Sequence, residues 1–127
     1  MSSSCSPLFS WTMFNIVLAS ETAIPPKKNA HSYVLYASET TVIKPKIIIP
    51  IPTGVYLSFP SDYFLYISSL SQKFGSNAHV IDSDYRGEIT CIVQSRCSEP
   101  FVVERGEPVA QLVFYKIVLP VFDVINN

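Results

Sequence analysis

The chain has little charge of either sign and no long apolar run. Nine Lys and Arg residues and ten Asp and Glu residues among 127 give a formal net charge of -1, and the basic residues are spread along the chain. A polynucleotide partner needs a dense basic surface, so we expect no nucleic-acid binding. No segment has the roughly 20 apolar residues of a membrane helix, so we expect no membrane span.

Cysteines are also few, and glycine is scarcer than proline. The three cysteines, Cys5, Cys91 and Cys97, are an odd number without the closely spaced pairs of a zinc site. We therefore expect free thiols, no metal site and an intracellular location. Ten prolines against four glycines punctuate the chain into short segments. Hydrophobic residues make up 48% of the chain, which suggests apolar surface that is buried against other copies.

The segments between the prolines are rich in Ile, Val, Tyr and Phe, several alternate in polarity, and none shows sustained helical periodicity. This pattern predicts one all-β domain, a jelly roll or distorted barrel, over residues 14–120. Only Ser68 to Lys73 could form a helical turn, so we expect at most one short helix. The serine-rich residues 1–13 are expected to be disordered. The predicted strands are 14–19, 33–37, 41–43, 47–49, 54–59, 63–67, 78–81, 88–94, 101–103 and 111–117.

The most informative segment runs from Val80 to Ile89, with the sequence VIDSDYRGEI. It places two carboxylates, a tyrosine and a glycine between two strand segments, as in a hairpin built to hold a ligand. A second interpretation is a polar turn chosen for its backbone conformations, with Tyr85 packed beside it and Arg86 paired to a neighbouring acid.

Four other segments belong with this one: IPTGV at 51–55, GEPVAQL at 106–112, HSYVLY at 31–36 and ISSLS at 67–71. In order and spacing, the five resemble sequence motifs of the trimeric dUTPases. There the corresponding segments read (I/V)PTG(V/I) and G(D/E)R(I/V)AQL, with AGYDLYS as the first motif and RSGLA as the second. The segment at 80–89 resembles the third motif, which accepts uracil. The resemblance implies a dUTPase-like fold and a homotrimer.

The resemblance also assigns roles to individual residues. Asp82 stands where the family's aspartate prepares the attacking water, and Tyr85 where a tyrosine excludes ribose. Ser68, Gly87 and Gln111 stand at substrate-binding positions, Gln111 as a phosphate contact. Hydrolysis of dUTP would further need Mg²⁺ over the triphosphate. No cofactor is expected without that activity.

Several motif positions carry the wrong chemistry for hydrolysis. Val34 replaces the first motif's aspartate, and a hydrocarbon can neither hold a metal through water nor accept a proton. Ile67 stands for the second motif's arginine and Pro108 for that of the fourth, so two cations are missing. His79 replaces a glycine where a base would enter. The tail at 121–127 lacks the glycine-rich fifth motif. We expect the catalytic positions to be vestigial.

The sequence therefore predicts a dUTPase-like domain without dUTPase activity. In its lost motifs it resembles the adenoviral early-region-four proteins, which implies a viral early protein that binds host signalling or regulatory proteins in the host cytoplasm or nucleus. The chain ends in Asn127, which cannot fill an apolar PDZ pocket, so we expect no PDZ binding through this tail. Two alternatives stay open: an active homotrimeric dUTP pyrophosphatase, and a sensor that binds deoxyuridine nucleotides without hydrolysis.

Overall fold

A computed structural model describes residues 13–70, 74–76 and 79–126, and within them every regular element is a β-strand. The expected all-β class is therefore confirmed. The strands are β2 (Asn15–Leu18), β3 (Lys27–Lys28), β4 (Tyr33–Tyr36), β5 (Thr41–Ile43), β6 (Ile48–Ser58), β7 (Tyr63–Ser69), β8 (Phe74–Ser76), β9 (His79–Ile81), β10 (Ile89–Ser95), β11 (Phe101–Val103) and β12 (Pro108–Lys116).

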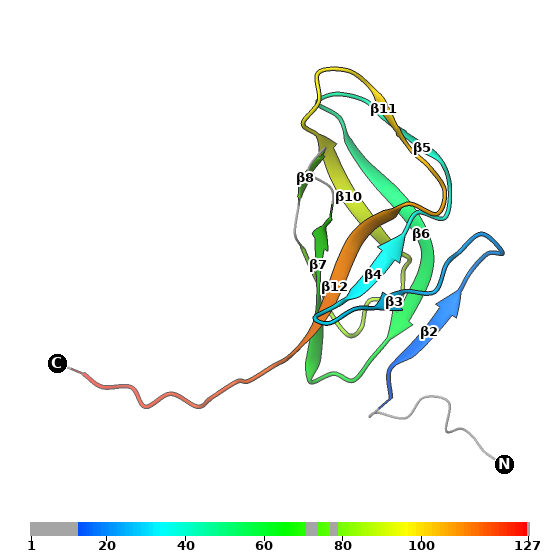
Figure 1. The fold of residues 1–127 in the computed structure, drawn as a ribbon. Coiled ribbons are helices and arrows are strands. Elements are labelled where there is room, and N and C mark those ends of the chain that lie inside the picture. Colours follow the sequence, from blue (N-terminus) through cyan, green and yellow to red (C-terminus); the bar gives the residue numbers. More distant parts are fainter. Residues whose placement is uncertain (1–12, 71–73, 77–78, 127) are drawn as a thin grey trace, which may run out of the picture.

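The strands form two larger sheets and a ribbon (Figure 1). One sheet has the order β2-β6-β10-β8 and the other the order β3-β4-β12-β7-β9, while β11 and β5 pair only with each other. All of these pairs are antiparallel. The centre of the five-stranded sheet is β12, which lies between β4 and β7 and so joins three segments that are far apart in the sequence.

The core lies between the sheets and is built by alternation along the strands. In β10 the side chains of Ile89, Cys91 and Val93 are buried, and in β7 those of Leu65 and Ile67. Alternate residues point to opposite faces of a strand, so each strand contributes every second side chain to the core. Burial leaves the Cys91 thiol in apolar surroundings and raises its pKa to about 11.

Most predicted strands are present, with informative exceptions. The predicted strands 47–49 and 54–59 are one strand, β6, because the backbone bends without leaving the sheet. The predicted helical turn from Ser68 is wrong at its start, since Ser68 and Ser69 end β7, and residues 71–73 lie outside the described part. The short strands β3 and β8 were not predicted. Residues 1–12 also lie outside the described part, so disorder there stays a prediction.

The bend in β6 is a bulge opposite β10. Ile89 pairs with Val55 and Thr90 with Pro52, so Thr53 and Gly54 have no partners in the ladder. Gly54 has a φ of 69°, which favours glycine, and a Cβ there would lie 2.7 Å from the Ala23 Cβ. The Ala19 amide donates to the Gly54 carbonyl at 2.8 Å, which ties the end of β2 to the bulge.

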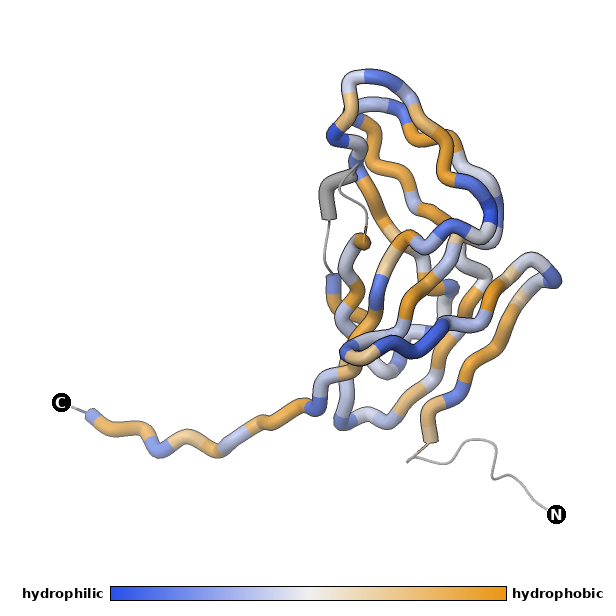
Figure 2. The backbone as a smooth tube through the Cα atoms, viewed as in Figure 1, coloured by the Kyte–Doolittle hydropathy of each residue, from blue (hydrophilic) through white to orange (hydrophobic). Residues whose placement is uncertain are grey.

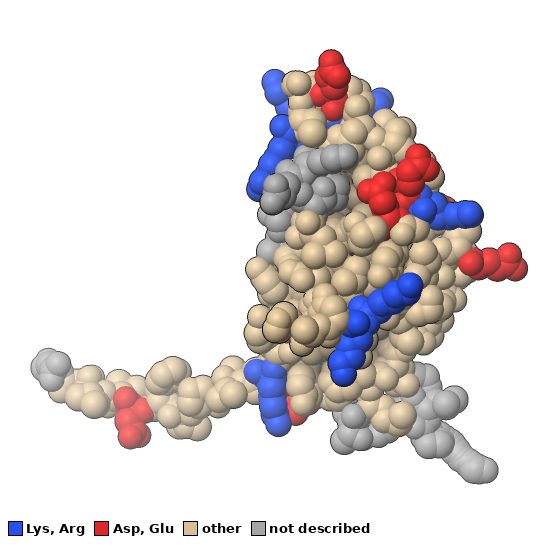
Figure 3. All heavy atoms as spheres, in the orientation of Figure 1, with Lys and Arg blue, Asp and Glu red and all other residues tan. Residues whose placement is uncertain are grey.

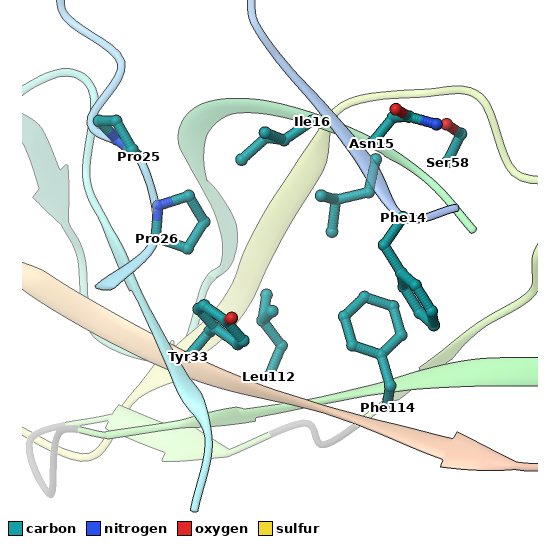
Figure 4. Close-up of a pocket in the computed structure, with 10 residues that line it drawn as sticks. Phe14, Asn15, Ile16, Pro25, Pro26, Tyr33, Ser58, Leu112 and Phe114 are labelled. Atoms are coloured by element: carbon teal, nitrogen blue, oxygen red, sulfur yellow. The ribbon is translucent and has the colours of Figure 1, made fainter. Parts of the chain in front are cut away.

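An apolar groove of about 490 Å³ lies beside β2 (Figure 4). Two prolines, Pro25 and Pro26, line one side, and the Phe14 and Phe114 rings meet edge to face, with their centroids 4.9 Å apart. β2 is an edge strand, and Ile16, at 45% exposure, also lines the groove. Among the described strands, the groove is therefore bordered by a strand edge without a partner.

The chain leaves the domain after β12 as an extended arm at residues 117–126 (Figure 1), and Figure 2 shows that most of the arm is hydrophobic. The Ile117 amide donates to the Asp62 carbonyl at 2.8 Å. Beyond that point the apolar side chains are almost fully exposed, at 97% for Val121 and 82% for Phe122. The described part of the chain offers no cover for these side chains.

The surface charges alternate in sign on the face in Figure 3, where Lys and Arg are interspersed with Asp and Glu. No helix in the described part of the chain is long and apolar enough to cross a membrane. The expectations of no nucleic-acid and no membrane partner stay predictions.

Replacing Gly54 by alanine should destabilise the fold by about 2–4 kcal/mol, because the substitution adds a steric overlap with Ala23 to the cost of a left-handed backbone. The matched control is Gly106→Ala: Gly106 has a φ of 89°, but its added Cβ would lie an acceptable 3.8 Å from Ile24. The control should lose only about 1–2 kcal/mol in urea unfolding. Equal losses in both variants would contradict this account of the bulge.

Candidate functional site

The first, second and fourth motif segments meet as one row across three strands. In the pairing of β12 with its neighbours, Gln111 lies opposite Val34 of β4 on one side and opposite Ser68 of β7 on the other. All three residues are partly buried, whereas Leu35, Ile67 and Leu112 next to them are buried in the core. The row therefore lies on the face of the five-stranded sheet that points away from the core.

The Gln111 side chain is held at both ends. Its amide nitrogen lies 3.2 Å from the Ser68 hydroxyl, and its amide oxygen lies 3.2 Å from the Ser32 hydroxyl. Ser32, which stands where the family has a glycine, is buried and lies 3.1 Å from Asn29 Oδ1 through the same hydroxyl. The Ser32 hydroxyl has one hydrogen and cannot donate to both oxygens. If the Gln111 amide is turned by 180°, its nitrogen donates to the Ser32 hydroxyl, and that hydroxyl donates to Asn29 Oδ1. The predicted phosphate contact is thus engaged within the chain.

The two positions at which the family has arginines are occupied here by structural residues. Ile67, at the place of the second motif's arginine, is 1% exposed and belongs to the core. Pro108, at the place of the fourth motif's arginine, begins β12 opposite Tyr36. A buried isoleucine and a proline offer no charge to a phosphate, so this face lacks the bidentate clamp that an arginine provides.

The segment from Val80 to Ile89 is not a hairpin, which corrects the prediction from the sequence. β9 pairs with β7 in one sheet, whereas β10 pairs with β6 and β8 in the other. Residues 82–88 therefore connect two sheets. The physical reason is that β9 pairs with β7, for example His79 with Ile67, and not with β10.

Internal bonds shape this connecting loop. The Tyr85 amide donates to the Asp82 carbonyl at 3.1 Å, and the Tyr85 hydroxyl donates to the Glu88 carbonyl at 2.8 Å. The tyrosine ring covers Gly87, where an added Cβ would lie 2.6 Å from the ring atom Cζ. A side chain at position 87 would therefore displace the Tyr85 ring from this place. Arg86 does not pair with an acid, as the turn interpretation proposed, but donates to the Ser83 carbonyl at 2.6 Å.

A cavity of about 450 Å³ opens beside the loop. Its lining includes Asp82, Asp84, Tyr85 and Glu88, together with His79, the first residue of β9. His79 is partly buried and takes up wall space where the family has only a glycine. The cavity can offer carboxylates and a tyrosine to a polar ligand of nucleoside size.

The predicted site residues thus fall into two groups. Ser68 and Gln111 lie together on the outer face of the five-stranded sheet, and Asp82, Tyr85 and Gly87 lie in the loop between the sheets. Neither Ser68 nor Gln111 lines the cavity beside Asp82. A single chain does not assemble all five positions around one ligand.

The residues at the first motif do not fit a magnesium ion. Val34 presents a hydrocarbon beside Gln111, whose amide is already bonded to two serines. In the described ranges no group of three or more His, Cys, Asp or Glu side chains could hold a metal. Carboxylate oxygens are the ligands that Mg²⁺ prefers, and this row offers none.

Two residues that interact within these groups were not among the predicted site residues. Ser32 lies in the first motif segment but was not assigned a role, and its bond to Gln111 follows from the register of β4 against β12. Glu88 follows Gly87 directly in the sequence, yet its partners, Thr53 and Gly54, lie 35 and 34 residues away. No local pattern could have identified either contact.

The sequence is similar to those of known proteins. The family model for dUTPase matches residues 15–127, so the chain belongs to the dUTPase family. The deoxyuridine 5'-triphosphate nucleotidohydrolase of Desulfitobacterium hafniense (strain DSM 10664 / DCB-2) is 43% identical over 88 residues, which cover 63% of this chain and 56% of the relative. The enzyme so named from Paramecium bursaria Chlorella virus 1 is 30% identical over 110 residues, covering 83% and 78%. The chain spans little more than half of the bacterial relative.

Solved structures agree with the fold. A mutant dUTPase from phage phi11 of S. aureus superposes with a TM-score of 0.80 at 21% identity, covering 91% of this chain and 98% of the other. The Staphylococcus bacteriophage 80alpha dUTPase gives a TM-score of 0.80 with 91% and 97% coverage. At this level of identity the likeness establishes the fold alone. The predicted dUTPase-like architecture is confirmed.

Proposed function

We propose that this chain is a dUTPase-family protein that does not hydrolyse dUTP and acts by binding other proteins. The observation that carries the proposal is the row formed by Val34, Gln111 and Ser68. It keeps the positions of three motifs in register but offers neither a carboxylate nor a cation. The proposed setting is that of a viral early protein, related to the adenoviral early-region-four group, which binds host signalling or regulatory factors in the cytoplasm or nucleus.

The enzymatic alternative has support of a different kind, since the relatives are named as dUTP nucleotidohydrolases. Hydrolysis would need a substitute for the aspartate at Val34 and for the arginine at Ile67. Other copies of the same chain cannot supply them, because every subunit of a homo-oligomer carries the same two hydrocarbons. A regulatory role has a parallel in the bacteriophage 80alpha dUTPase, which is described as controlling transfer of virulence genes.

The direct test is pyrophosphate release from dUTP with Mg²⁺, measured at high protein concentration beside an Asp82→Asn variant. We expect no release above that variant, because the row holds no group that could position the metal or neutralise the developing charge. Turnover of about one per second in the unmodified chain, abolished by Asp82→Asn, would contradict the proposal and establish the enzymatic alternative.

A second candidate function is binding of deoxyuridine nucleotides without hydrolysis. The observation that favours it is the cavity beside Asp82 and Tyr85, which is separate from the altered row. A nucleoside monophosphate would use this cavity and little of the phosphate machinery. The side chain of His79, which lines this cavity, weighs against a base entering it.

Titration with dUMP separates this sensor from a pure protein scaffold. If the cavity takes the nucleoside, the heat of binding should saturate, and Tyr85→Ala should weaken binding by at least about tenfold because the variant removes a ring from the cavity wall. Absence of saturation at millimolar dUMP, or binding that Tyr85→Ala leaves unchanged, would count against the sensor.

We further propose that the protein is a homotrimer in which neighbouring copies cover the apolar arm. The support is the exposure of the arm at residues 118–125, together with the groove and the edge of β2 that no other described strand covers. An isolated chain would leave all three in water, at a cost that association removes.

Multi-angle light scattering at micromolar concentration tests the assembly. The expected mass is that of three chains. In the variant Phe122→Asp the trimer should dissociate at concentrations where the unmodified chain stays assembled, because a carboxylate would enter an apolar contact. Asp123→Ala is the matched control and should assemble as the unmodified chain does. A single-chain mass for the unmodified protein would refute the trimer.

A further inference from the structure

Glu88 compensates the broken ladder at the β6 bulge. Thr53 and Gly54 are buried and pair with no residue in the ladder to β10, although the Thr53 hydroxyl donates to the Ile89 carbonyl. Their amides instead donate to one oxygen of the Glu88 carboxylate, Oε2, at 3.1 Å and 2.9 Å. Buried amide groups must find acceptors, so this carboxylate takes the place of the missing cross-strand carbonyls.

The same residue also contacts the cavity loop through its main chain. The Glu88 carbonyl accepts the hydroxyl of Tyr85, whose ring lies over Gly87. Glu88 itself is partly buried and lines the cavity with Tyr85. One residue therefore connects the bulge in the four-stranded sheet to the tyrosine beside the cavity.

We propose that Glu88 is the positioning residue of the loop from Asp82 to Glu88. Its side chain fastens the end of the loop to the bulge of β6, and the fixed main chain then holds the Tyr85 ring over Gly87. Without this attachment the Glu88 carbonyl would be fixed only through the next residue, Ile89, whose carbonyl accepts the Thr53 hydroxyl. The consequence for ligand selectivity rests on the proposed nucleotide binding, whereas the attachment itself does not.

Reach, and not charge, is the property that this role requires. Both amides bind a single oxygen, and a glutamine can present one oxygen at the same distance from the main chain. An aspartate keeps the charge but is one methylene shorter, so it cannot span the gap to both amides. Glu88→Gln and Glu88→Asp therefore form a matched pair that separates the two properties.

The first measurement is amide hydrogen exchange by NMR on the full chain. In Glu88→Asp the Thr53 and Gly54 amides should exchange at least about tenfold faster than in the unmodified chain. In Glu88→Gln they should stay within about threefold. The amide of Leu65, in the core of the other sheet, reports whether each variant is folded. The control Glu107→Ala removes a carboxylate that accepts the Glu104 amide in an exposed turn, and it should leave Thr53 and Gly54 unchanged.

The second measurement is the nuclear Overhauser contact between the Tyr85 ring and the Gly87 α-hydrogens. A role confined to stabilising the sheets would leave this contact intact, whereas the proposed role predicts that it is lost in Glu88→Asp and retained in Glu88→Gln. Tyr85→Phe should weaken the ring contact but keep the Thr53 and Gly54 amides protected, since it removes only the hydroxyl bond.

The third measurement compares dUMP with UMP. If the unmodified chain binds dUMP, the ratio of the UMP and dUMP dissociation constants should fall at least about fivefold in Glu88→Asp, and little in Glu88→Gln. If the unmodified chain binds neither nucleotide, the proposed nucleotide binding fails, and the first two measurements still decide the role of Glu88. Wild-type behaviour of Glu88→Asp, or loss of protection in Glu88→Gln as complete as in Glu88→Asp, would overturn the proposal.

Discussion

The register of β12 against β4 and β7 is the constraint on which the rest of the molecule depends. It places Gln111 between Val34 and Ser68 on one face and, by alternation, sets Leu112 beside the buried Ile67 on the other. Because side chains alternate with a period of two, a slip of one residue would expose the core side chains of this sheet to solvent. The side chains of the outer row would then point into the core. The arrangement of the motif positions is therefore inseparable from the burial that stabilises the domain.

Core residues and motif residues lie on opposite faces of the sheet, which explains how the fold can persist while the chemistry changes. The inward residues, such as Leu35 and Leu112, determine the packing, and the outward row contributes little to it. Replacement of a carboxylate by Val34 on the outer face removes a ligand without opening a cavity in the core. The replacement at Ile67 adds an apolar side chain to the core itself. Membership of the dUTPase family consequently constrains the interior of this chain more tightly than its outer surface.

Sequence patterns predicted the class, most strands and the residues of the row, because alternation and motif order are local signals. Their limits lie in contacts between distant segments. The connection from Asp82 to Glu88 was expected to be a hairpin, but β9 pairs with β7, which no pattern within the loop encodes. The same holds for the helical turn expected from Ser68, where pairing with Gln111 extends a strand. The attachment of Glu88 to Thr53 likewise depends on a register shift in a different pair of strands.

The burial of Cys91 has a consequence for how this chain meets oxidants. A thiol with a pKa of about 11 is ionised in only about one molecule in ten thousand at pH 7, and thiolate is the form that reacts. The side chain is also 2% exposed, with its sulfur 3.7 Å from the Val109 carbonyl. Burial and the raised pKa together make this thiol slow to react with oxidants.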